Sequence, residues 1–361
     1  MKLKFKIYIA SFFCFLIEPY GFSQDPHFTQ FYNSTLTVNP AYTGVFSSKD
    51  ETNNTTNIRL LSNYRSQWSN SQSPYTTGTV QMDAKLGSQD DVIEENTIQN
   101  KFNLGLLCMY DQSLNGAFKS TYFMGSGSLH LALGGGSGFG IGTAKSAIHT
   151  KSLGLGFGFV YGNRVVDLSK ISFSQQFSSG GFDLTLPNGE FGLNNMKPFF
   201  SLNAGLLYQS QDEDKDNKFK LGVSGYHLNK PKQSFLNDAN QIVPIRYSFQ
   251  MEYMKYLGDN FLETKLIYQT QAEIKYLLIS TIYNIILPGN LSGDEKQNSI
   301  GIGANYRVGD AISPYLALTT DRFRFGFSYD ITTSKLKTGL IPARSMEVSM
   351  QFILSKSGSQ E

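Results

Sequence analysis

Residues 322–331 read RFRFGFSYDI and alternate without a break between apolar and polar or small side chains. Successive side chains of a β-strand point to opposite faces, so this stretch predicts a strand with one apolar and one polar face. The apolar face holds Phe323, Phe325, Phe327, Tyr329 and Ile331, and the other face holds Arg322, Arg324, Gly326, Ser328 and Asp330. Such a strand lies between an apolar and a polar environment.

The same period of two recurs along the chain and is clearest at 153–159, 300–308 and 346–354. About 14 segments qualify as strands of the ~10 residues that a tilted membrane strand needs. They are 57–67, 76–86, 101–111, 118–132, 149–161, 198–210, 218–228, 245–257, 261–270, 273–286, 297–308, 312–320, 322–332 and 344–354. Connections such as 258–260 are too short for parallel crossovers, so we predict an antiparallel meander.

The fold class that this pattern favours is all-β: a transmembrane antiparallel β-barrel of about 14 strands. A soluble sandwich or jelly roll would also alternate, but a sheet of this many strands would have to split or close. Aromatic residues recur along the apolar faces, and no apolar run of about 18 residues exists beyond the first 23 residues, which excludes a helical membrane protein. The barrel is therefore the preferred prediction, and the sandwich is the alternative.

The N-terminus has the features of a secretory signal peptide. Lysines in the first six residues precede an apolar stretch at 7–17, and Gly21 and Ser23 are the small residues favoured before a cleavage site. We expect removal of residues 1–23 and a mature start at Gln24. The predicted organisation is a signal peptide at 1–23, an N-terminal segment at 24–56, the barrel at 57–354 and a polar tail at 355–361.

Charge and cysteine content narrow the possible partners. The formal net charge is +2 and no basic run occurs, which argues against a nucleic-acid partner. Once the leader is removed, Cys108 is the only cysteine, so no intramolecular disulfide is expected. The lipid bilayer of the outer membrane is the first expected partner of a barrel with this pattern.

Connection lengths favour one orientation without settling it. If the chain starts in the periplasm, connections after odd-numbered strands face outward, and three long ones do: 162–197, 229–244 and 333–343. Three other long connections, 87–100, 133–148 and 287–296, would then lie on the periplasmic side. Either these contact periplasmic components or the strand count is wrong by one hairpin.

Motifs for catalysis, metals or cofactors are weak throughout. The acidic run at 212–217 starts like a calcium loop, but it has Asn217 where that loop needs glycine and Val223 where it needs glutamate. The four histidines lie in separate segments without metal-ligand spacing, and the glycine-rich stretch at 134–142 lacks the lysine and the following Ser or Thr of a phosphate loop. We predict a protein that is not an enzyme and has no metal or cofactor.

Four blocks of sequence resemble the PorP/SprF family, membrane proteins of the type IX secretion system and gliding motility of Bacteroidetes. They are QDPHFTQFYNSTLTVNPAYTG at 24–44, YRSQW at 64–68, GYHLNKPKQSF at 225–235 and SYDITTSKL at 328–336, in the family's order. The resemblance implies an outer-membrane barrel that supports export or surface retention of a secreted protein such as a large adhesin, with other type IX components as possible partners. The alternatives are a channel or uptake barrel for small or hydrophobic solutes, and a barrel that docks periplasmic motor components.

Two sets of candidate site residues follow. The segment at 24–46 is rich in aromatics, which are unfavourable in water. We therefore expect it to start on the periplasmic side of strand one and to fold into or across the barrel mouth, with Phe28, Phe31, Tyr32 and Tyr42 as lumen contacts. In the outer loops, which lipid does not cover, the candidate partner contacts are His227, Asn229, Pro231 and Phe235.

Overall fold

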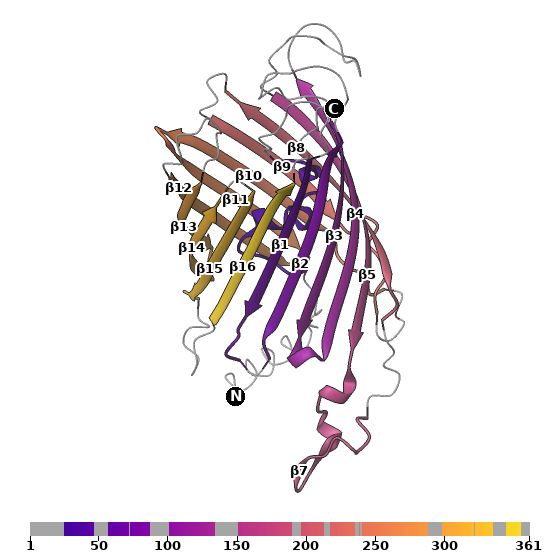
Figure 1. Cartoon of the computed structure of the whole chain (residues 1–361). Helices are drawn as coiled ribbons and strands as arrows, with labels where there is room; N and C mark the ends of the chain where they lie inside the picture. The colour runs from indigo at the N-terminus through magenta and orange to yellow at the C-terminus, as the bar shows by residue number, and fades with distance from the viewer. Residues whose placement is uncertain are drawn as a thin grey trace, which may run out of the picture.

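A single closed barrel makes up most of the chain (Figure 1). The computed structural model describes residues 25–46, 57–71, 73–86, 101–133, 151–189, 196–212, 217–234, 238, 240–287, 298–320, 322–334 and 344–354. The barrel strands are β1 (Asn57–Gln67), β2 (Tyr75–Leu86), β3 (Lys101–Ser113), β4 (Phe118–Leu133), β5 (Lys151–Val166), β8 (Phe199–Gln211), β9 (Asn217–Tyr226), β10 (Arg246–Leu257), β11 (Asn260–Gln271), β12 (Ile274–Ile286), β13 (Ser299–Arg307), β14 (Ala311–Thr319), β15 (Phe323–Thr332) and β16 (Arg344–Leu354).

Pairing is antiparallel between successive barrel strands, and β1 closes the ring by pairing with β16. β6 (Phe177–Ser178) and β7 (Gly181–Phe182) form a separate small hairpin in the long connection between β5 and β8. The predicted all-β barrel of about 14 strands is confirmed. The sandwich alternative is wrong, because a closed ring leaves the apolar faces outside rather than between two sheets.

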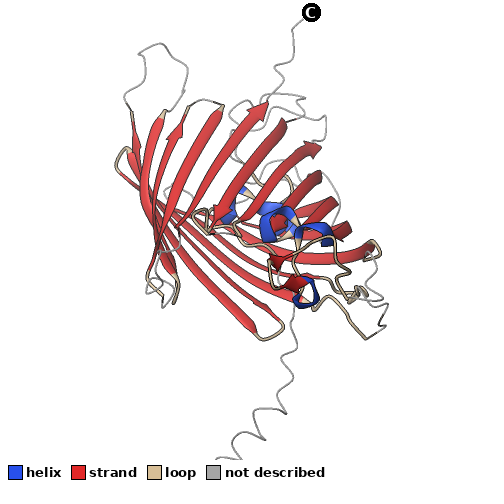
Figure 2. Cartoon of the chain, turned by 90° about the horizontal axis from the view of Figure 1, so that it is seen from below, coloured by secondary structure: helices blue, strands red, loops and turns tan. Residues whose placement is uncertain are grey.

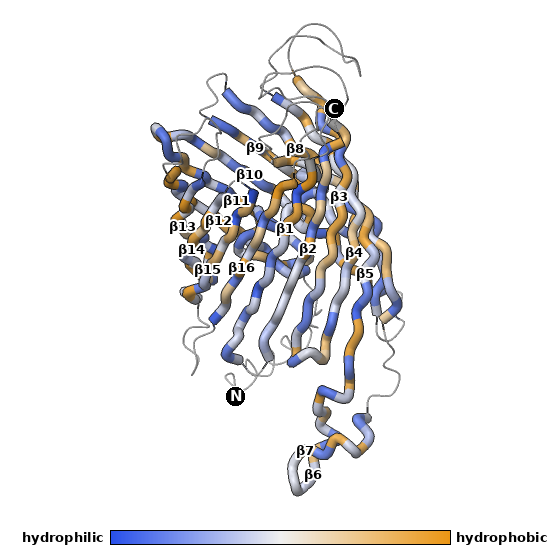
Figure 3. The backbone as a smooth tube through the Cα atoms, viewed as in Figure 1, coloured by the Kyte–Doolittle hydropathy of each residue, from blue (hydrophilic) through white to orange (hydrophobic). Residues whose placement is uncertain are grey.

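Burial along the strands is the inverse of that in a soluble protein. On β15, Phe327 is 46% exposed on the outer face, whereas its neighbour Ser328 is fully buried inside. On β16, Val348 is 45% exposed and Glu347 is 1% exposed. The alternation of apolar and polar residues is visible along the strands in Figure 3. Apolar side chains therefore face outward, where lipid is their favourable environment.

The barrel has two ends, which we define by the chain. The hairpin rim is the end at which β5 leads into β6 and β7, and the terminal rim is the end at which β1 begins and β16 ends (Figure 1). The connections at 87–100, 133–148 and 287–296 join strands at the terminal rim, and nearly all their residues lie outside the described ranges. The strand count is thus not wrong by a hairpin, and both rims carry long connections.

Residues 25–46, which we call the plug, lie inside the barrel. They form three short 3-10 helices, η1 (Phe31–Asn33), η2 (Thr35–Thr37) and η3 (Pro40–Tyr42), within the ring of strands (Figure 2). Residue Asn39 caps η3 by accepting a hydrogen bond from the backbone N–H of Ala41, and Pro40 fits the first position because its missing N–H is not needed there. Among the described residues all helices are short 3-10 helices, and none is long and apolar enough to cross a membrane.

The plug runs from one rim to the other. Asp25 lies beside Arg246 at the start of β10, on the hairpin rim, and Phe46 lies under Arg59 and Lys85 near the terminal rim. The prediction that the N-terminal segment lies in the lumen is confirmed. The predicted start on the side where β1 begins is wrong: the segment starts at the hairpin rim, opposite the start of β1, and passes through the barrel to the terminal rim.

The apolar core of the protein sits between the plug and the barrel wall. One buried cluster joins Phe31, Tyr32 and Val38 of the plug to Ile267, Leu278, Ile282, Tyr315 and Ala317 of the wall. A second surrounds Leu36 with Leu107, Tyr122, Met124, Val160, Phe199, Tyr226 and Val243. A third packs Ala41 and Tyr42 on Leu207. The lumen therefore offers apolar sockets in an otherwise polar surface, and the plug fills them.

Candidate functional site: the plugged lumen

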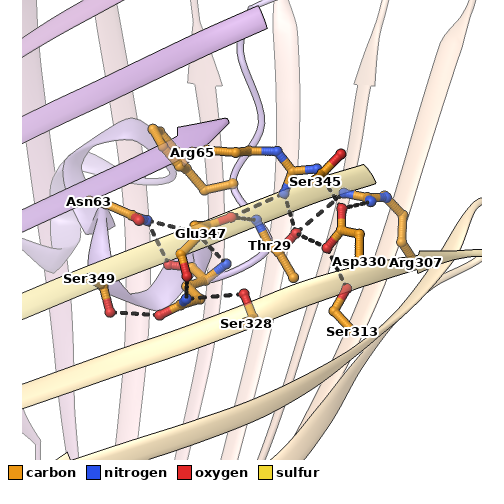
Figure 4. A network of polar contacts seen from close by, with 12 residues as sticks. Thr29, Asn63, Arg65, Arg307, Ser313, Ser328, Asp330, Ser345, Glu347 and Ser349 are labelled. Atoms are coloured by element: carbon orange, nitrogen blue, oxygen red, sulfur yellow. Dashed lines mark hydrogen bonds and ion pairs between the residues drawn. The ribbon is translucent and has the colours of Figure 1, made fainter. Parts of the chain in front are cut away.

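Glu347 of β16 holds the start of the plug by its backbone. Its carboxylate accepts hydrogen bonds from the backbone N–H groups of Thr29 at 2.7 Å and Gln30 at 2.8 Å. It also accepts from Asn63 Nδ2 at 2.9 Å and pairs with Arg65 at 3.0 Å (Figure 4). With 1% exposure, Glu347 is removed from water and satisfied by these donors alone. Hydrogen bonds to a buried ionised group are among the stronger ones, so this contact fixes the plug.

Asp330 of β15 completes the same network (Figure 4). It pairs with Arg65 at 2.8 Å and with Arg307 of β13, and it accepts a hydrogen bond from Ser313 Oγ at 2.6 Å. Thr29 Oγ1 also lies within hydrogen-bond distance of the Asp330 carboxylate, at 3.4 Å. Two guanidinium groups and two carboxylates are thus paired in the interior, as buried charges require.

A second charged cluster surrounds the first described residue of the plug. The Asp25 carboxylate lies 2.9 Å from His227 Nε2, 3.1 Å from Arg246 Nη1 and 4.0 Å from Arg164 Nη2. Burial by itself would raise the pKa of Asp25, but His227, Arg246 and Arg164 outweigh burial and hold the pKa well below its ordinary value. The carboxylate is therefore ionised at neutral pH.

The middle of the plug is bound through its carbonyl oxygens. Tyr226 Oη donates to the Leu36 carbonyl at 2.5 Å, Arg246 Nη2 to that of Thr37 at 2.7 Å, and Ser224 Oγ to that of Val38 at 2.6 Å. These three wall residues lie on β9 and at the start of β10. Backbone groups that no helix or sheet satisfies are in this way paired with the wall.

The terminal-rim half of the plug touches the wall closely because the wall has glycines there. A Cβ added at Gly156 of β5 would lie 2.5 Å from Ala41 Cα and closer still to the Ala41 nitrogen. Beyond it, Ser128 Oγ donates to the Thr43 carbonyl at 2.8 Å and Gly44 N donates to Asp83 at 2.7 Å. Only glycine at position 156 leaves room for the plug backbone.

The loop that follows β9 turns into the lumen at His227. The backbone φ of His227 is +58°, a left-handed conformation that few residues adopt, and its buried ring reaches Asp25 on one side and Ser201 Oγ at 2.8 Å on the other. Two residues on, the side-chain amide of Asn229 pairs with backbone groups of β8, as the backbone of a neighbouring strand would. It accepts a hydrogen bond from the N–H of Leu202 at 3.0 Å and donates to the carbonyl of Phe200 at 2.8 Å.

The residues predicted as lumen contacts all lie in the lumen. Phe28, Phe31 and Tyr42 are 3–4% exposed and Tyr32 is 9% exposed. The predicted partner-loop residues are placed differently from one another. His227 and Asn229 make the contacts within the chain described above, Pro231 is buried and accepts from Val243 N at 2.8 Å, and Phe235 lies outside the described residues. Contact of these four residues with a partner stays a prediction.

Sequence reasoning missed most of the wall residues that bind the plug. Three of the four sequence blocks contribute one wall residue each, namely Arg65, His227 and Asp330. Arg65 and Asp330 contact Thr29, and His227 contacts Asp25, so all three meet the fourth block, which is the plug. Arg164, Arg246 and Glu347 lie outside those blocks. A signal did exist for Glu347, because a carboxylate on the polar face of a strand points into the lumen.

No group of three or more His, Cys, Asp or Glu side chains is placed to hold a metal ion in the described ranges. The charged groups of the lumen are instead occupied with one another and with the plug. What this arrangement can do chemically is bind peptide. It presents carboxylates to N–H groups, hydroxyls and guanidinium groups to carbonyls, and apolar sockets to aromatic side chains.

These features define a membrane β-barrel of the outer-membrane type whose lumen is filled by its own N-terminal segment. The chain belongs to the PorP/SprF family, described as type IX secretion system membrane proteins, and the family model matches residues 21–352. The resemblance predicted from the four sequence blocks is thereby confirmed.

Solved structures of other barrels are similar in fold. A mutant of the monoaromatic hydrocarbon channel TodX (deltaS2S3) has 9% identity and a TM-score of 0.47, covering 90% of this chain and 94% of that one. A FadL homologue of Pseudomonas aeruginosa has 10% identity and a TM-score of 0.46, covering 88% and 91%. CdiB from Acinetobacter baumannii has 8% identity and a TM-score of 0.37, covering 83% of this chain, which spans 60% of CdiB. At these values they say nothing about function. None of the curated proteins compared with the sequence matches it.

Proposed function

We propose that this protein lies in the outer membrane with its hairpin rim outside, after removal of the leader before Gln24. There it supports export or surface retention of a partner secreted protein, such as a large adhesin, through the type IX secretion machinery. Membership of the PorP/SprF family supports the link to this machinery. The observation that carries the partner role is the long connection between β5 and β8, which projects beyond the barrel (Figure 1).

This projection, residues 167–189, is held in shape by a buried amide. The side-chain amide of Gln176 accepts a hydrogen bond from Phe173 N at 3.1 Å and donates one to the Leu186 carbonyl at 2.9 Å. The backbone carbonyl of Gln176 accepts a third from Asp183 N at 2.8 Å. Such internal bonds fix the loop before any partner arrives, which lowers the entropy lost on binding.

Around that fixed frame, the apolar side chains point outward. Phe177 is 65% exposed, Phe182 is 59% exposed and Leu184 is 55% exposed, and the two phenylalanine rings contact each other with centroids 5.1 Å apart. Because the loop projects beyond the rim, these side chains are away from the lipid belt. Exposed aromatic groups on an ordered projection are typical anchors of a protein interface.

The plugged lumen favours this function over a solute channel. An uptake barrel would need an open path lined by substrate-binding groups, whereas the plug extends from rim to rim with its aromatic side chains buried. Docking of periplasmic components would use the long terminal-rim connections, nearly all of which lie outside the described residues.

A double substitution tests the partner role of the projection. We expect Phe177→Ser with Phe182→Ser to deplete one or a few secreted proteins from the cell surface, while the amount of folded barrel, measured by its heat-modifiable mobility in gels, is unchanged. The matched control is Ser172→Ala with Ser174→Ala, which alters two exposed polar residues of the same loop. An unaltered surface proteome in the phenylalanine variant would contradict the assignment of this loop.

Deletion of the gene separates the three functions more broadly. Loss of one or a few surface proteins with normal solute uptake supports the proposal. Loss of uptake with an intact surface proteome would instead support a channel, and a general defect in secretion or motility with no selective loss would support docking of motor components.

A further inference from the structure

The basic side chains around Asp25 all belong to the barrel, and together they form a receptor for its carboxylate. Arg164 comes from β5, His227 from the loop directly after β9 and Arg246 from β10, whereas the carboxylate comes from the plug. The three basic side chains are each no more than 5% exposed. Two guanidinium groups and an imidazole therefore converge, out of water, on an acid that is not part of the wall.

Without an acid at this position, Arg246 would lose the carboxylate with which it pairs among the described residues. Leaving a buried cation unpaired is strongly unfavourable, so anything that replaced the plug would have to bring its own carboxylate. Arg246 also has spare capacity. Its Nε finds no hydrogen-bond partner among the described residues, and the side chain lines a small cavity between the plug and the wall, together with His27 and Tyr276.

The rest of the plug is held as a ligand would be. Among the described residues, no β-bridge joins the plug to the barrel, whose strand pairs are all between barrel strands. Glu347 binds two backbone N–H groups, while Tyr226 and Ser224 bind backbone carbonyls, and contacts of this kind do not select the side chains of the bound segment. Selectivity would come from the carboxylate receptor, from the apolar sockets and from wall groups that bind plug side chains, such as Ser349 for Asn33 at 2.7 Å and Gln250 for Asn39 at 3.0 Å.

Spacing along the plug defines what a ligand needs. Phe31 and Tyr32, which enter the first apolar socket, follow Asp25 by six and seven positions (31 − 25 and 32 − 25). Leu36, which enters the second socket, follows by eleven (36 − 25). A segment with an acid at its start and bulky apolar groups at these distances would match the carboxylate receptor and both apolar sockets.

We propose that the lumen is a peptide-binding site, that the plug is its tethered resident ligand, and that a partner segment with this acid-then-aromatic pattern exchanges with the plug. Arg164, His227 and Arg246 recognise its carboxylate, Glu347 its backbone, and the two apolar clusters its side chains. The site does not depend on the proposed function of the projecting loop, because none of its residues belongs to residues 167–189.

Exchange can be measured on the intact, folded chain. A protease site is placed in residues 47–56, between the plug and β1, and is cut only after the full-length barrel has folded in detergent. A fluorescent synthetic peptide of residues 24–46 is then added, and binding is followed by fluorescence anisotropy. We expect the peptide to enter the cut barrel and not the uncut one, in which the tethered plug competes at high effective concentration.

Substituted peptides test the receptor. An Asp25→Asn peptide should bind at least about 30-fold more weakly, because truncating one partner of a buried charge pair is costly. A Gln24→Ala peptide, altered at the residue before the acid, is the control and should bind like the parent. In a barrel with Arg246→Met, the Asp25→Asn penalty should shrink, since the two changes remove the same contact.

Two results would overturn the proposal. One is absence of peptide entry into the cut barrel over days, which would make the plug a permanent part of the fold. The other is equal binding of the parent and Asp25→Asn peptides, which would mean that the basic cluster does not select an acid. Loss of surface proteins in the Phe177 and Phe182 variant bears on neither result, so the two proposals fail separately.

Discussion

Replacing Glu347 with alanine removes the contact that holds the start of the plug, and we expect the plug to leave its docked position more often. The carboxylate binds the N–H groups of Thr29 and Gln30 and pairs with Arg65. After the change, two plug amides and part of a guanidinium group lose their acceptor, while Asp330 still pairs with Arg65.

The size of the effect follows from these contacts. Each buried N–H left without an acceptor costs roughly 1–3 kcal/mol, and removing one partner of a buried ion pair costs roughly 3–5 kcal/mol. The sum of these costs overestimates the effect, because Asp330 still pairs with Arg65 and water can enter the space left by the Glu347 side chain. We expect about 3 kcal/mol in the free energy of plug docking, which corresponds to a shift on the order of 100-fold in the docking equilibrium.

Hydrogen exchange of the plug measures this shift. The peptide covering residues 25–46 should exchange on the order of 100-fold faster in the Glu347→Ala protein than in the parent, with the barrel strands still protected. Glu263→Gln is the control. It removes a lumen carboxylate that pairs with Lys265 and Arg324 of the wall at 3.3 and 3.2 Å.

Two outcomes would refute this reasoning. If plug exchange in Glu347→Ala equals that in Glu263→Gln, Glu347 does not hold the plug. If the parent plug already exchanges at the rate of an unstructured peptide, the docked arrangement does not describe the protein in solution.

Two further perturbations act on the plug from other directions. Burial, together with Arg246, lowers the pKa of His27 in the docked plug from 6.5 to about 4. The docked plug therefore takes up a proton less readily than the released plug, and acidification from pH 7 towards pH 4 favours release. Plug exchange at pH 5, corrected for the intrinsic rate, should be about 20-fold faster than at pH 7. His27→Gln should remove this difference, and its persistence in the variant would assign it to another group. Gly156→Ala places a methyl group against the backbone of Ala41 and should weaken plug docking by about 1–3 kcal/mol, which would be measured as faster plug exchange. The control is Gly125→Ala on β4, where an added Cβ meets nothing within 4 Å, and this change should have no effect on the plug. Equal exchange in the two glycine variants would show that the close approach at Gly156 is not needed.

The sequence by itself determined the strands of this barrel. The period-two pattern is a local property, and each predicted segment overlaps one observed barrel strand, with ends that differ by a few residues at most, such as 149–161 against Lys151–Val166 for β5. Composition also indicated where residues 24–46 belong, because Phe28, Phe31, Tyr32 and Tyr42 are too apolar for water, and an N-terminal segment next to a barrel has the lumen available to bury them.

Only the tertiary structure decided which charges meet. Asp25 binds Arg164 and Arg246, and Arg65 binds Asp330 and Glu347, across separations of more than a hundred residues that no local pattern encodes. Closing the ring brings β1 beside β16 and so places Arg65 next to Glu347, its partner in the register of the two strands. The inward turn at His227 places its ring between Ser201 of β8 and Asp25, and the contact with Asp25 exists only once the plug is inside. The alternation of side chains determines which face of each strand points into the lumen, whereas closure of the barrel determines which side chains meet there.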